Sequence, residues 1–174
     1  MPRLFFALWP NPEVRAQLVT QRDLAAREYR GRPMRADTLH MTLVFLGQTP
    51  DLRVPMALEC GDRIRAKSFT LSIDTRAHFP AAKVAWLGCT GTPAALHELR
   101  NLLLPELDHV QFIHRDSNTD YQPHITIARD CLTWPPPKEI PAIEWLVEDF
   151  VLVDSTRTPG GPVYRVLRHW QLDG

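Results

Sequence analysis

The pattern His-x-Thr occurs twice in this chain, and each copy lies in a run of apolar and β-branched residues. The first copy is in residues 39–47 (LHMTLVFLG) and the second in residues 123–129 (PHITIAR). Such runs are typical of β-strands, in which successive side chains point to opposite faces. In each copy the His and the Thr therefore share one face, while the apolar residues beside them can be buried on the other.

Two such strands facing each other would form one site with two imidazoles, His40 and His124, and two hydroxyls, Thr42 and Thr126. A histidine titrates at about pH 6.5, so one imidazole can accept a proton while the other, protonated, donates one. This pair suits in-line displacement at phosphorus, with the hydroxyls donating to the phosphoryl oxygens and no metal ion required. Alternatively, each His is an ordinary hydrogen-bonded or surface residue and the repeat is a coincidence. The shared strand setting argues against coincidence.

Length and composition are those of a folded globular protein. The chain has 174 residues, 44% of them hydrophobic and 23% charged, and we expect residues 1–174 to form a single domain of two lobes. Its net formal charge is zero, whereas proteins that bind a long stretch of nucleic-acid backbone usually carry a basic excess. Any nucleic-acid ligand is therefore expected to be short, or held only at one end.

The sequence motifs do not predict a disulfide framework, a metal site, a signal peptide or a membrane span. Cys60, Cys89 and Cys131 are far apart and predict neither a disulfide framework nor a zinc site. His97 and the next residue open an H-E-x-x-H pattern, but Asn101 replaces the second His. The apolar run at the N-terminus is short for a signal peptide and predicts a first strand instead. No apolar run approaches the ~20 residues of a membrane span, so we expect a cytoplasmic protein.

The rest of the pattern predicts helices interspersed with strands. Helices are expected over residues 12–29 with Asn11 as N-cap, over 54–66, where Gly61 weakens the pattern, and from Thr92-Pro93 through 103. Strands are expected within residues 1–10, 39–47, 69–74, 83–88, 123–129, 146–154 and 163–170, with a polar loop at 115–120. Because several strands are consecutive, this order favours an α+β fold with mostly antiparallel sheet.

Two further residues near the motifs have alternative interpretations. Arg129, three residues past Thr126, could pair with a phosphate through its guanidinium or could be a solvated arginine. Tyr164 could stack on a base or close the core, and the core interpretation is favoured. Surface or loop positions are expected for His78, His97, His109, His114 and His169, and core positions for Trp86, Trp145, Phe150 and Trp170.

With these motifs, the sequence resembles the two-histidine (2H) phosphoesterase superfamily. It is most similar to the bacterial RNA 2',3'-cyclic phosphodiesterases, also called 2'-5' RNA ligases. The resemblance covers nearly the whole chain and rests on residues 3–7 (RLFFA), 39–47, 79–80 (FP), 84–88 (VAWLG), 123–129 and 161–164 (GPVY).

The resemblance implies a fold of two pseudo-symmetric lobes of mostly antiparallel sheet, with outer helices around a central cleft. It makes His40 the proton donor and His124 the proton acceptor, with Thr42 and Thr126 binding the phosphate. Arg129 matches a basic residue often found at its position, which favours a phosphate or ribose contact. The implied reaction opens a terminal 2',3'-cyclic phosphate to a 2'-phosphomonoester, without metal or cofactor.

The expected partners are RNA 3' ends or small cyclic nucleotides, and the chain is expected to be a monomer with no obligate protein partner. Two alternatives stay open. The first is a 2'-5' RNA ligase, the same chemistry reversed, although hydrolysis is expected to win in water by mass action. The second is a non-catalytic nucleotide-binding module, against which the intact His and Thr pairs argue.

Overall fold

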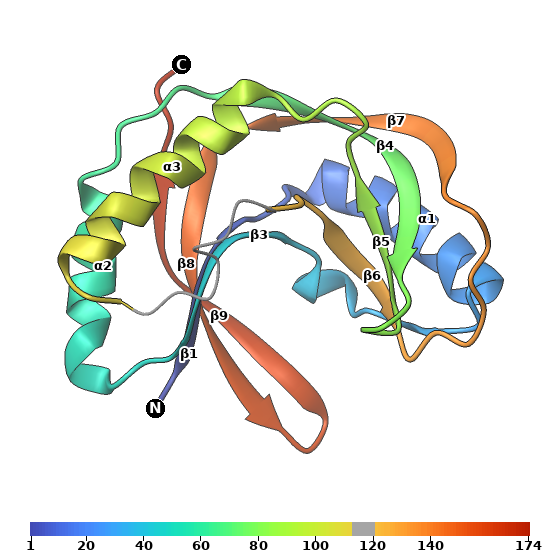
Figure 1. The fold of residues 1–174 in the computed structure, drawn as a ribbon, viewed down its shortest axis with the longest axis horizontal. Helices are drawn as coiled ribbons and strands as arrows, with labels where there is room; N and C mark the ends of the chain where they lie inside the picture. The colour runs from blue at the N-terminus through green and yellow to red at the C-terminus, as the bar shows by residue number, and fades with distance from the viewer. Residues whose placement is uncertain (113–120) are drawn as a thin grey trace.

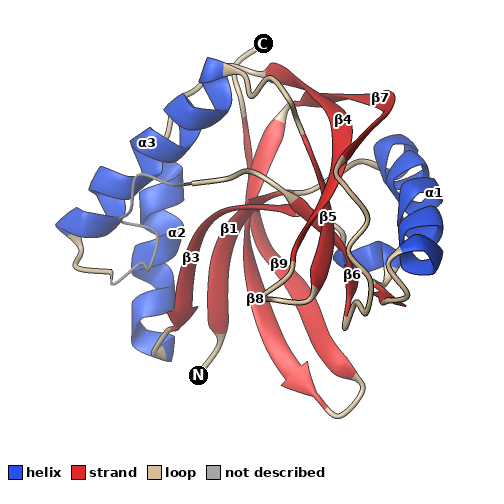
Figure 2. Ribbon diagram, turned by 45° about the vertical axis from the view of Figure 1, so that its right-hand side comes forward, coloured by secondary structure: helices blue, strands red, loops and turns tan. Residues whose placement is uncertain are grey.

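The computed structural model describes residues 1–112 and 121–174, which form two antiparallel sheets with helices on their outer sides (Figures 1 and 2). The strands are β1 (Arg3–Leu8), β2 (Arg32–Pro33), β3 (Met41–Gln48), β4 (Phe69–Phe79), β5 (Val84–Gly88), β6 (Ile125–Arg129), β7 (Lys138–Val147), β8 (Asp149–Thr158) and β9 (Gly161–Gln171). The α-helices are α1 (Pro12–Glu28), α2 (Val54–Asp62) and α3 (Ala94–His109), and single 3-10 turns cover Ala36–Thr38 and Asp51–Arg53. This is the predicted α+β class.

The two sheets repeat one plan. The four-stranded sheet has the order β3-β1-β8-β9, and four strands of the five-stranded sheet have the matching order β6-β5-β4-β7, with β2 added beside β6. In each sheet, the strand that begins directly after a motif histidine pairs with an earlier strand of the chain. One long helix lies between the two strands in sequence: α1 between β1 and β3, and α3 between β5 and β6. Each of these helices packs against the sheet of the other half: α1 packs against β6 and β7 of the five-stranded sheet, and α3 packs against β3 of the four-stranded sheet. The two predicted pseudo-symmetric lobes are therefore present.

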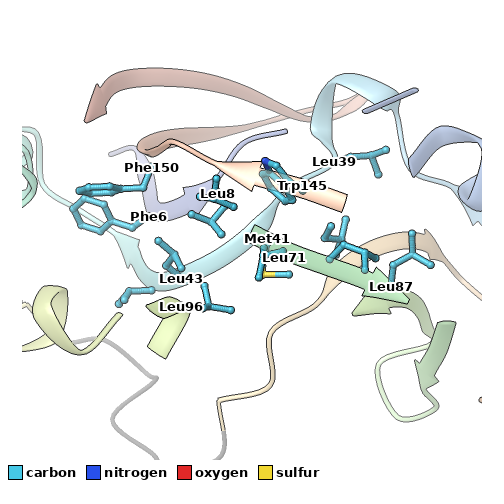
Figure 3. Packing of buried hydrophobic residues seen from close by; sticks show 14 of the residues in the cluster. Phe6, Leu8, Leu39, Met41, Leu43, Leu71, Leu87, Leu96, Trp145 and Phe150 are labelled. Atoms are coloured by element: carbon cyan, nitrogen blue, oxygen red, sulfur yellow. The ribbon is translucent and has the colours of Figure 1, made fainter. Parts of the chain in front are cut away.

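One large apolar cluster contains side chains from both sheets and from all three helices, and so joins the two halves. From the four-stranded sheet it takes Phe6, Leu8 and Phe150, and from the five-stranded sheet Leu71, Leu87 and Trp145, with Leu96 entering from α3 (Figure 3). A smaller cluster, formed by Phe5, Ala7, Val151 and Val153, lies on the opposite face of β1 and β8. Strand β1 is thus buried on both faces, which explains its uninterrupted apolar sequence.

The structure corrects several element boundaries. Residues 146–154 are not one strand, because the chain leaves β7 and enters β8 of the other sheet at Glu148. The sequence pattern predicts no strand over most of β7. This strand contains Pro141, but it lies at a sheet edge and its register shifts there, which is where a strand tolerates proline. The short edge strand β2 was also not predicted. Thr92 does not cap α3, whose N-cap is Pro93.

The predicted polar loop at 115–120 and His114 lie outside the described residues. Within the described residues, no helix is long and apolar enough to cross a membrane. Asn11 caps α1 as predicted, its side chain accepting a hydrogen bond of 2.9 Å from the backbone N–H of Val14.

Candidate active site

The structure brings all five predicted site residues to one cavity between the two sheets, with a volume of about 510 Å³. His40 and Thr42 come from β3 and the residue before it, and His124, Thr126 and Arg129 from β6 and the residue before it. The apolar neighbours Met41 and Ile125 are fully buried, as the strand alternation requires. Residues about 80 positions apart in sequence therefore share one cavity.

Both motif strands carry a β-bulge at the residue after the threonine. On β3, Thr42 and Val44 pair with consecutive residues of β1, and Leu43 is left without a partner. On β6, Thr126 and Ala128 pair with consecutive residues of β5, and Ile127 is left in the same way. A bulge inserts one extra residue and so reverses the facing of every residue beyond it.

The two bulges place a matching pair of side chains at the cavity. Phe45 and Arg129 are each three residues past their threonine, and both line the cavity although strict alternation would turn them to the other face. Arg129 was singled out from the sequence, but Phe45 was not. Phe45 could have been predicted by comparing the two motifs, since it occupies in the first motif the position that Arg129 occupies in the second.

Each of the two motif imidazoles is oriented by the same local hydrogen bond. Nδ1 of His40 lies 2.6 Å from the carbonyl oxygen of Thr38, and Nδ1 of His124 lies 2.8 Å from the carbonyl oxygen of Gln122. A carbonyl oxygen only accepts, so Nδ1 carries the proton in both rings. Nε2 is then the nitrogen that can exchange a proton with a ligand, in both halves of the site.

Aromatic rings surround His40. Its ring centroid lies 4.8 Å from that of Phe5, 5.4 Å from that of Trp9, and 5.4 Å from that of Tyr164. This burial lowers the pKa of His40 from 6.5 to about 4, because a charged imidazolium is poorly solvated there. The hydrogen bond to the Thr38 carbonyl opposes the shift, and the positive charge of His124 adds to it.

His124 has a similar but separate aromatic setting. Phe79 and Trp86 lie edge-on to its ring at centroid distances of 5.1 and 6.2 Å. Burial lowers the pKa of His124 below its ordinary value, and the guanidinium of Arg129 acts in the same direction. Both imidazoles are thus mostly neutral at pH 7. An anion bound between them would favour the protonated form of each and raise both pKa values.

The cavity is positively charged although the chain as a whole is neutral. Its described lining includes the guanidinium groups of Arg3, Arg129 and Arg157 and contains no aspartate or glutamate. Hydroxyl donors are provided by the two motif threonines and by Ser155 and Thr158 on the β8–β9 hairpin. Together these groups form a site suited to an anion with several oxygen acceptors.

Some other sequence interpretations need revision. Tyr164 packs edge-on against Phe5 in the smaller apolar cluster, but it also lines the cavity, so it is not a core residue alone. His78 is not a surface residue: it is partly buried in β4, with its ring 5.8 Å from Tyr29 and 5.2 Å from Trp134. Exposed positions are found, as predicted, for His97, His109 and His169.

The part of the chain that the structure describes holds no group of three or more His, Cys, Asp or Glu side chains placed to bind a metal ion. Each of the three cysteines is a free thiol.

Comparison with known proteins gives consistent matches over nearly the whole chain. Residues 10–159 match the profile of the 2'-5' RNA ligase superfamily. The chain is 34% identical to the RNA 2',3'-cyclic phosphodiesterase of Escherichia coli K12, over 98% of this chain and 96% of that protein. It is 33% identical to the RNA 2',3'-cyclic phosphodiesterase of Thermus thermophilus, over 99% and 91% of the two chains. Among solved structures, E. coli LigT complexed with 3'-AMP matches with a TM-score of 0.85 and 34% identity, over 99% of each chain.

Proposed function

Because this chain belongs to the 2'-5' RNA ligase superfamily, we propose that it is an RNA 2',3'-cyclic phosphodiesterase acting at RNA 3' ends or on small cyclic nucleotides. The substrate carries a phosphodiester closed between its terminal 2' and 3' oxygens. Water replaces the 3' oxygen on phosphorus, and the product is a 2'-phosphomonoester with a free 3' hydroxyl. The observation that carries the proposal is the meeting of His40 and His124 in one positively charged cavity, each with an Nε2 that has no hydrogen-bond partner among the described residues.

The proposed roles divide the proton transfers between the two imidazoles. Neutral His124 accepts a proton from the attacking water at Nε2, while a new bond forms between the water oxygen and phosphorus. The bond from phosphorus to the 3' oxygen breaks, and His40 donates the proton from its Nε2 to that oxygen. The donor and acceptor assignment follows the family pattern, since the local geometry of the two imidazoles is the same.

The low pKa of His40 has a consequence for this mechanism. At pH 7 the imidazole is neutral, so it has to take up a proton when the anionic substrate binds. A bound phosphate favours this uptake by its charge. As the bond from phosphorus to the 3' oxygen breaks, negative charge develops on that oxygen. A buried imidazolium donates its proton readily to this oxygen, which is the property that a general acid needs.

Thr42, Thr126 and Arg129 are proposed to bind the phosphoryl group. The two hydroxyls flank the site symmetrically, one on each motif strand, and can donate to the two non-bridging oxygens. Arg129 lies close enough to lower the pKa of both catalytic imidazoles, so its charge also acts on an anion held between them. Aligned donors of this kind hold the phosphorus in line with water and leaving oxygen.

Substitution of each imidazole tests the proposal. His40→Gln and His124→Gln should each lower kcat for 2',3'-cyclic AMP by at least about 100-fold, the typical contribution of one general acid or base. The exposed residue His97, changed to Gln, is the matched control and should keep wild-type activity. The wild-type profile of kcat against pH should be bell-shaped, and activity should persist in a chelator. Full activity in either site variant would refute the assignment.

The reverse reaction is a second candidate, favoured by the superfamily's description as 2'-5' RNA ligases. Attack by a ribose hydroxyl in place of water would join two RNA ends through the same imidazole pair. Incubating matched RNA fragments, one with a cyclic phosphate and one with a free 5' hydroxyl, and separating joined from opened product measures the balance. We expect opening to dominate, because water is present at far higher concentration than RNA ends.

We also propose that residues 1–174 work as a single monomeric domain in the cytoplasm. The apolar cluster shared by the two sheets supports a single domain, because neither half would bury its core alone. The three free thiols fit a reducing compartment. Sedimentation of the purified chain would test the monomer.

A further inference from the structure

The cavity, at about 510 Å³, is larger than a single cyclic phosphate requires, and its lining includes charged residues to which the proposed chemistry gives no role. They are Arg3, at the start of β1, and Arg157, on β8. Strand β8 and strand β9 form a hairpin that projects beyond the rest of the sheet (Figure 1). We propose that Arg3 and Arg157 form a second phosphate subsite, which binds the internucleotide phosphate on the 5' side of the terminal nucleotide. This inference rests on the proposed function and narrows its substrate class to oligonucleotides rather than mononucleotides.

The strand register places both arginines on the face of the sheet that carries His40. Leu4 pairs with Asp154, so the preceding residue Arg3 lies opposite Ser155, and Ser155 pairs across the hairpin with Tyr164. Residues opposite each other in an antiparallel sheet share a face. Arg157, two residues past Ser155 on the same strand, is therefore also on that face, as its place in the cavity lining agrees.

The same register gives an order along the cavity. Tyr164 is in ring contact with His40, and Arg157 lies two residues, roughly 7 Å, farther along β8 from the residue opposite Tyr164. Arg129 acts on both imidazoles and belongs with the reacting phosphate. Arg3 and Arg157 are then displaced from that phosphate toward the hairpin, in the direction in which a neighbouring nucleotide could extend.

Both arginines are available to an anion. Arg157 is exposed, and the side chain of Arg3 has its guanidinium 5.4 Å from the ring centroid of Phe45. Among the described residues, neither is ion-paired with a carboxylate. The contrast within the same hairpin is clear, because Arg165, on the opposite face, is 3.4 Å from Asp154, and Arg168 is paired with Asp62. Charge left unpaired in a concave, positively charged surface is typical of a phosphate site.

The surface beyond the subsite is also hollowed. A second cavity of about 460 Å³ shares Arg3, Ser155 and Arg157 with the first. It also takes in Asp51 and the Asp154–Arg165 pair on the opposite face of the sheet, so it presents carboxylates as well as guanidinium groups. The path proposed for the neighbouring phosphate is therefore the first cavity, whose described lining contains no carboxylate.

The test compares three substrates, two of which differ only in one charge. They are 2',3'-cyclic AMP, the dinucleotide ApA ending in a 2',3'-cyclic phosphate, and the same dinucleotide with a neutral methylphosphonate between its nucleosides. Wild-type kcat/KM should be about tenfold higher for the phosphate dinucleotide than for the methylphosphonate, which is the usual value of one charge-assisted contact. Arg157→Gln and Arg3→Gln should each remove most of this discrimination, mainly through KM.

Arg168→Gln is the matched control, since it removes the same charge from the same hairpin but lines neither cavity. It should keep the wild-type ratio between the two dinucleotides. The inference is overturned if wild type treats both dinucleotides alike, or if Arg157→Gln lowers kcat/KM equally for all three substrates. If Arg3→Gln does not fold, the comparison of Arg157→Gln with wild type is sufficient for the test.

A binding measurement separates this inference from the proposed function. If wild type opens none of the cyclic phosphates, the proposed function fails. Calorimetry with ApA ending in a 2'-phosphate, against its methylphosphonate counterpart, then still tests the subsite. About tenfold tighter binding of the charged dinucleotide, lost in Arg157→Gln, would support it. Equal affinities would refute it.

Discussion

The indole of Trp9 stacks on the imidazole of His40, with ring centroids 5.4 Å apart and planes inclined by only 14°. Trp9 directly follows β1, so the strand that pairs with the first motif also provides the ring that covers its histidine. The guanidinium of Arg15, from α1, lies 5.8 Å from the centroid of the same indole. Trp9 therefore fixes the plane of His40 and keeps water from it, which connects packing at the edge of the cavity with proton chemistry inside it.

Exposure of His40 by substitution of Trp9 should raise its pKa. In Trp9→Ser, water reaches the imidazole and solvates its charged form, so the pKa should rise from about 4 toward the ordinary 6.5. Trp9→Phe keeps an apolar ring in place and should leave the pKa close to the wild-type value. NMR titration of the imidazole resonances measures both. A pKa in Trp9→Ser equal to that of wild type would mean that other rings account for the burial.

The same low pKa should weaken the fold in acid. Between pH 6.5 and about pH 4 the unfolded chain binds a proton at His40 that the folded protein does not, so the free energy of unfolding falls as the pH falls through this window. The loss from this group is at most about 3 kcal/mol. His40→Gln removes it, and this variant should lose less stability than wild type between pH 7 and pH 4.

Urea denaturation at each pH provides the measurement, and His97→Gln, at an exposed position, is the control that should follow wild type. If His40→Gln and wild type lost equal stability over the window, the imidazole of His40 would have to be as well solvated in the folded protein as in the unfolded chain.

The local features of this fold were predictable from the sequence, and the features set by distant pairing were not. Alternation over residues 40–43 and 124–127 predicts the buried faces correctly, and Asn11 marks the start of α1. The bulges at Leu43 and Ile127 arise from pairing with β1 and β5. The sequence of a motif strand alone does not show where that strand carries an extra residue relative to its partner. Strict alternation would therefore place Arg129 on the wrong face.

The sequence does not predict that Arg3 and Arg157 line the same cavity as the motif residues, again because their proximity depends on strand pairing. Arg3 and Arg157 are separated by most of the chain, and they become neighbours only because β1 pairs with β8. Each looks like an ordinary surface arginine when the sequence is read locally. The two motifs indicate the cavity in which the reaction is proposed, but they carry no information about the other charged residues that line it.

Arg100 should be essential for stability because it satisfies the bulge beneath the first motif. This α3 side chain is only 6% exposed, and its Nε donates a 3.1 Å hydrogen bond to the carbonyl oxygen of Leu43, the unpaired bulge residue. Arg100→Met leaves that carbonyl buried without this donor, which should cost about 2–3 kcal/mol. Arg63→Met, which breaks an exposed pair with Glu106, should cost less than about 1 kcal/mol.

Chemical denaturation at pH 7 compares the two variants. Because the bulge sets the facing of the residues around it, Arg100→Met should also raise KM more than an equally destabilising change remote from the cavity. Equal and small losses of stability in both arginine variants would show that the bulge carbonyl is satisfied in another way.

Gly61 provides a test of packing that is independent of the active site. A Cβ atom at this α2 position would overlap the indole of Trp170, which is held there by a 2.7 Å hydrogen bond from its Nε1 to Asp62 and by stacking on Phe150 at 5.0 Å. Gly61→Ala should therefore lower the free energy of unfolding by roughly 1–3 kcal/mol, although alanine is the better helix former. In a Trp170→Leu background the overlap is absent, and the same change should become neutral or stabilising. A cost of Gly61→Ala that is equal in both backgrounds would contradict the close approach of α2 and β9, while activity per folded molecule should be unchanged throughout.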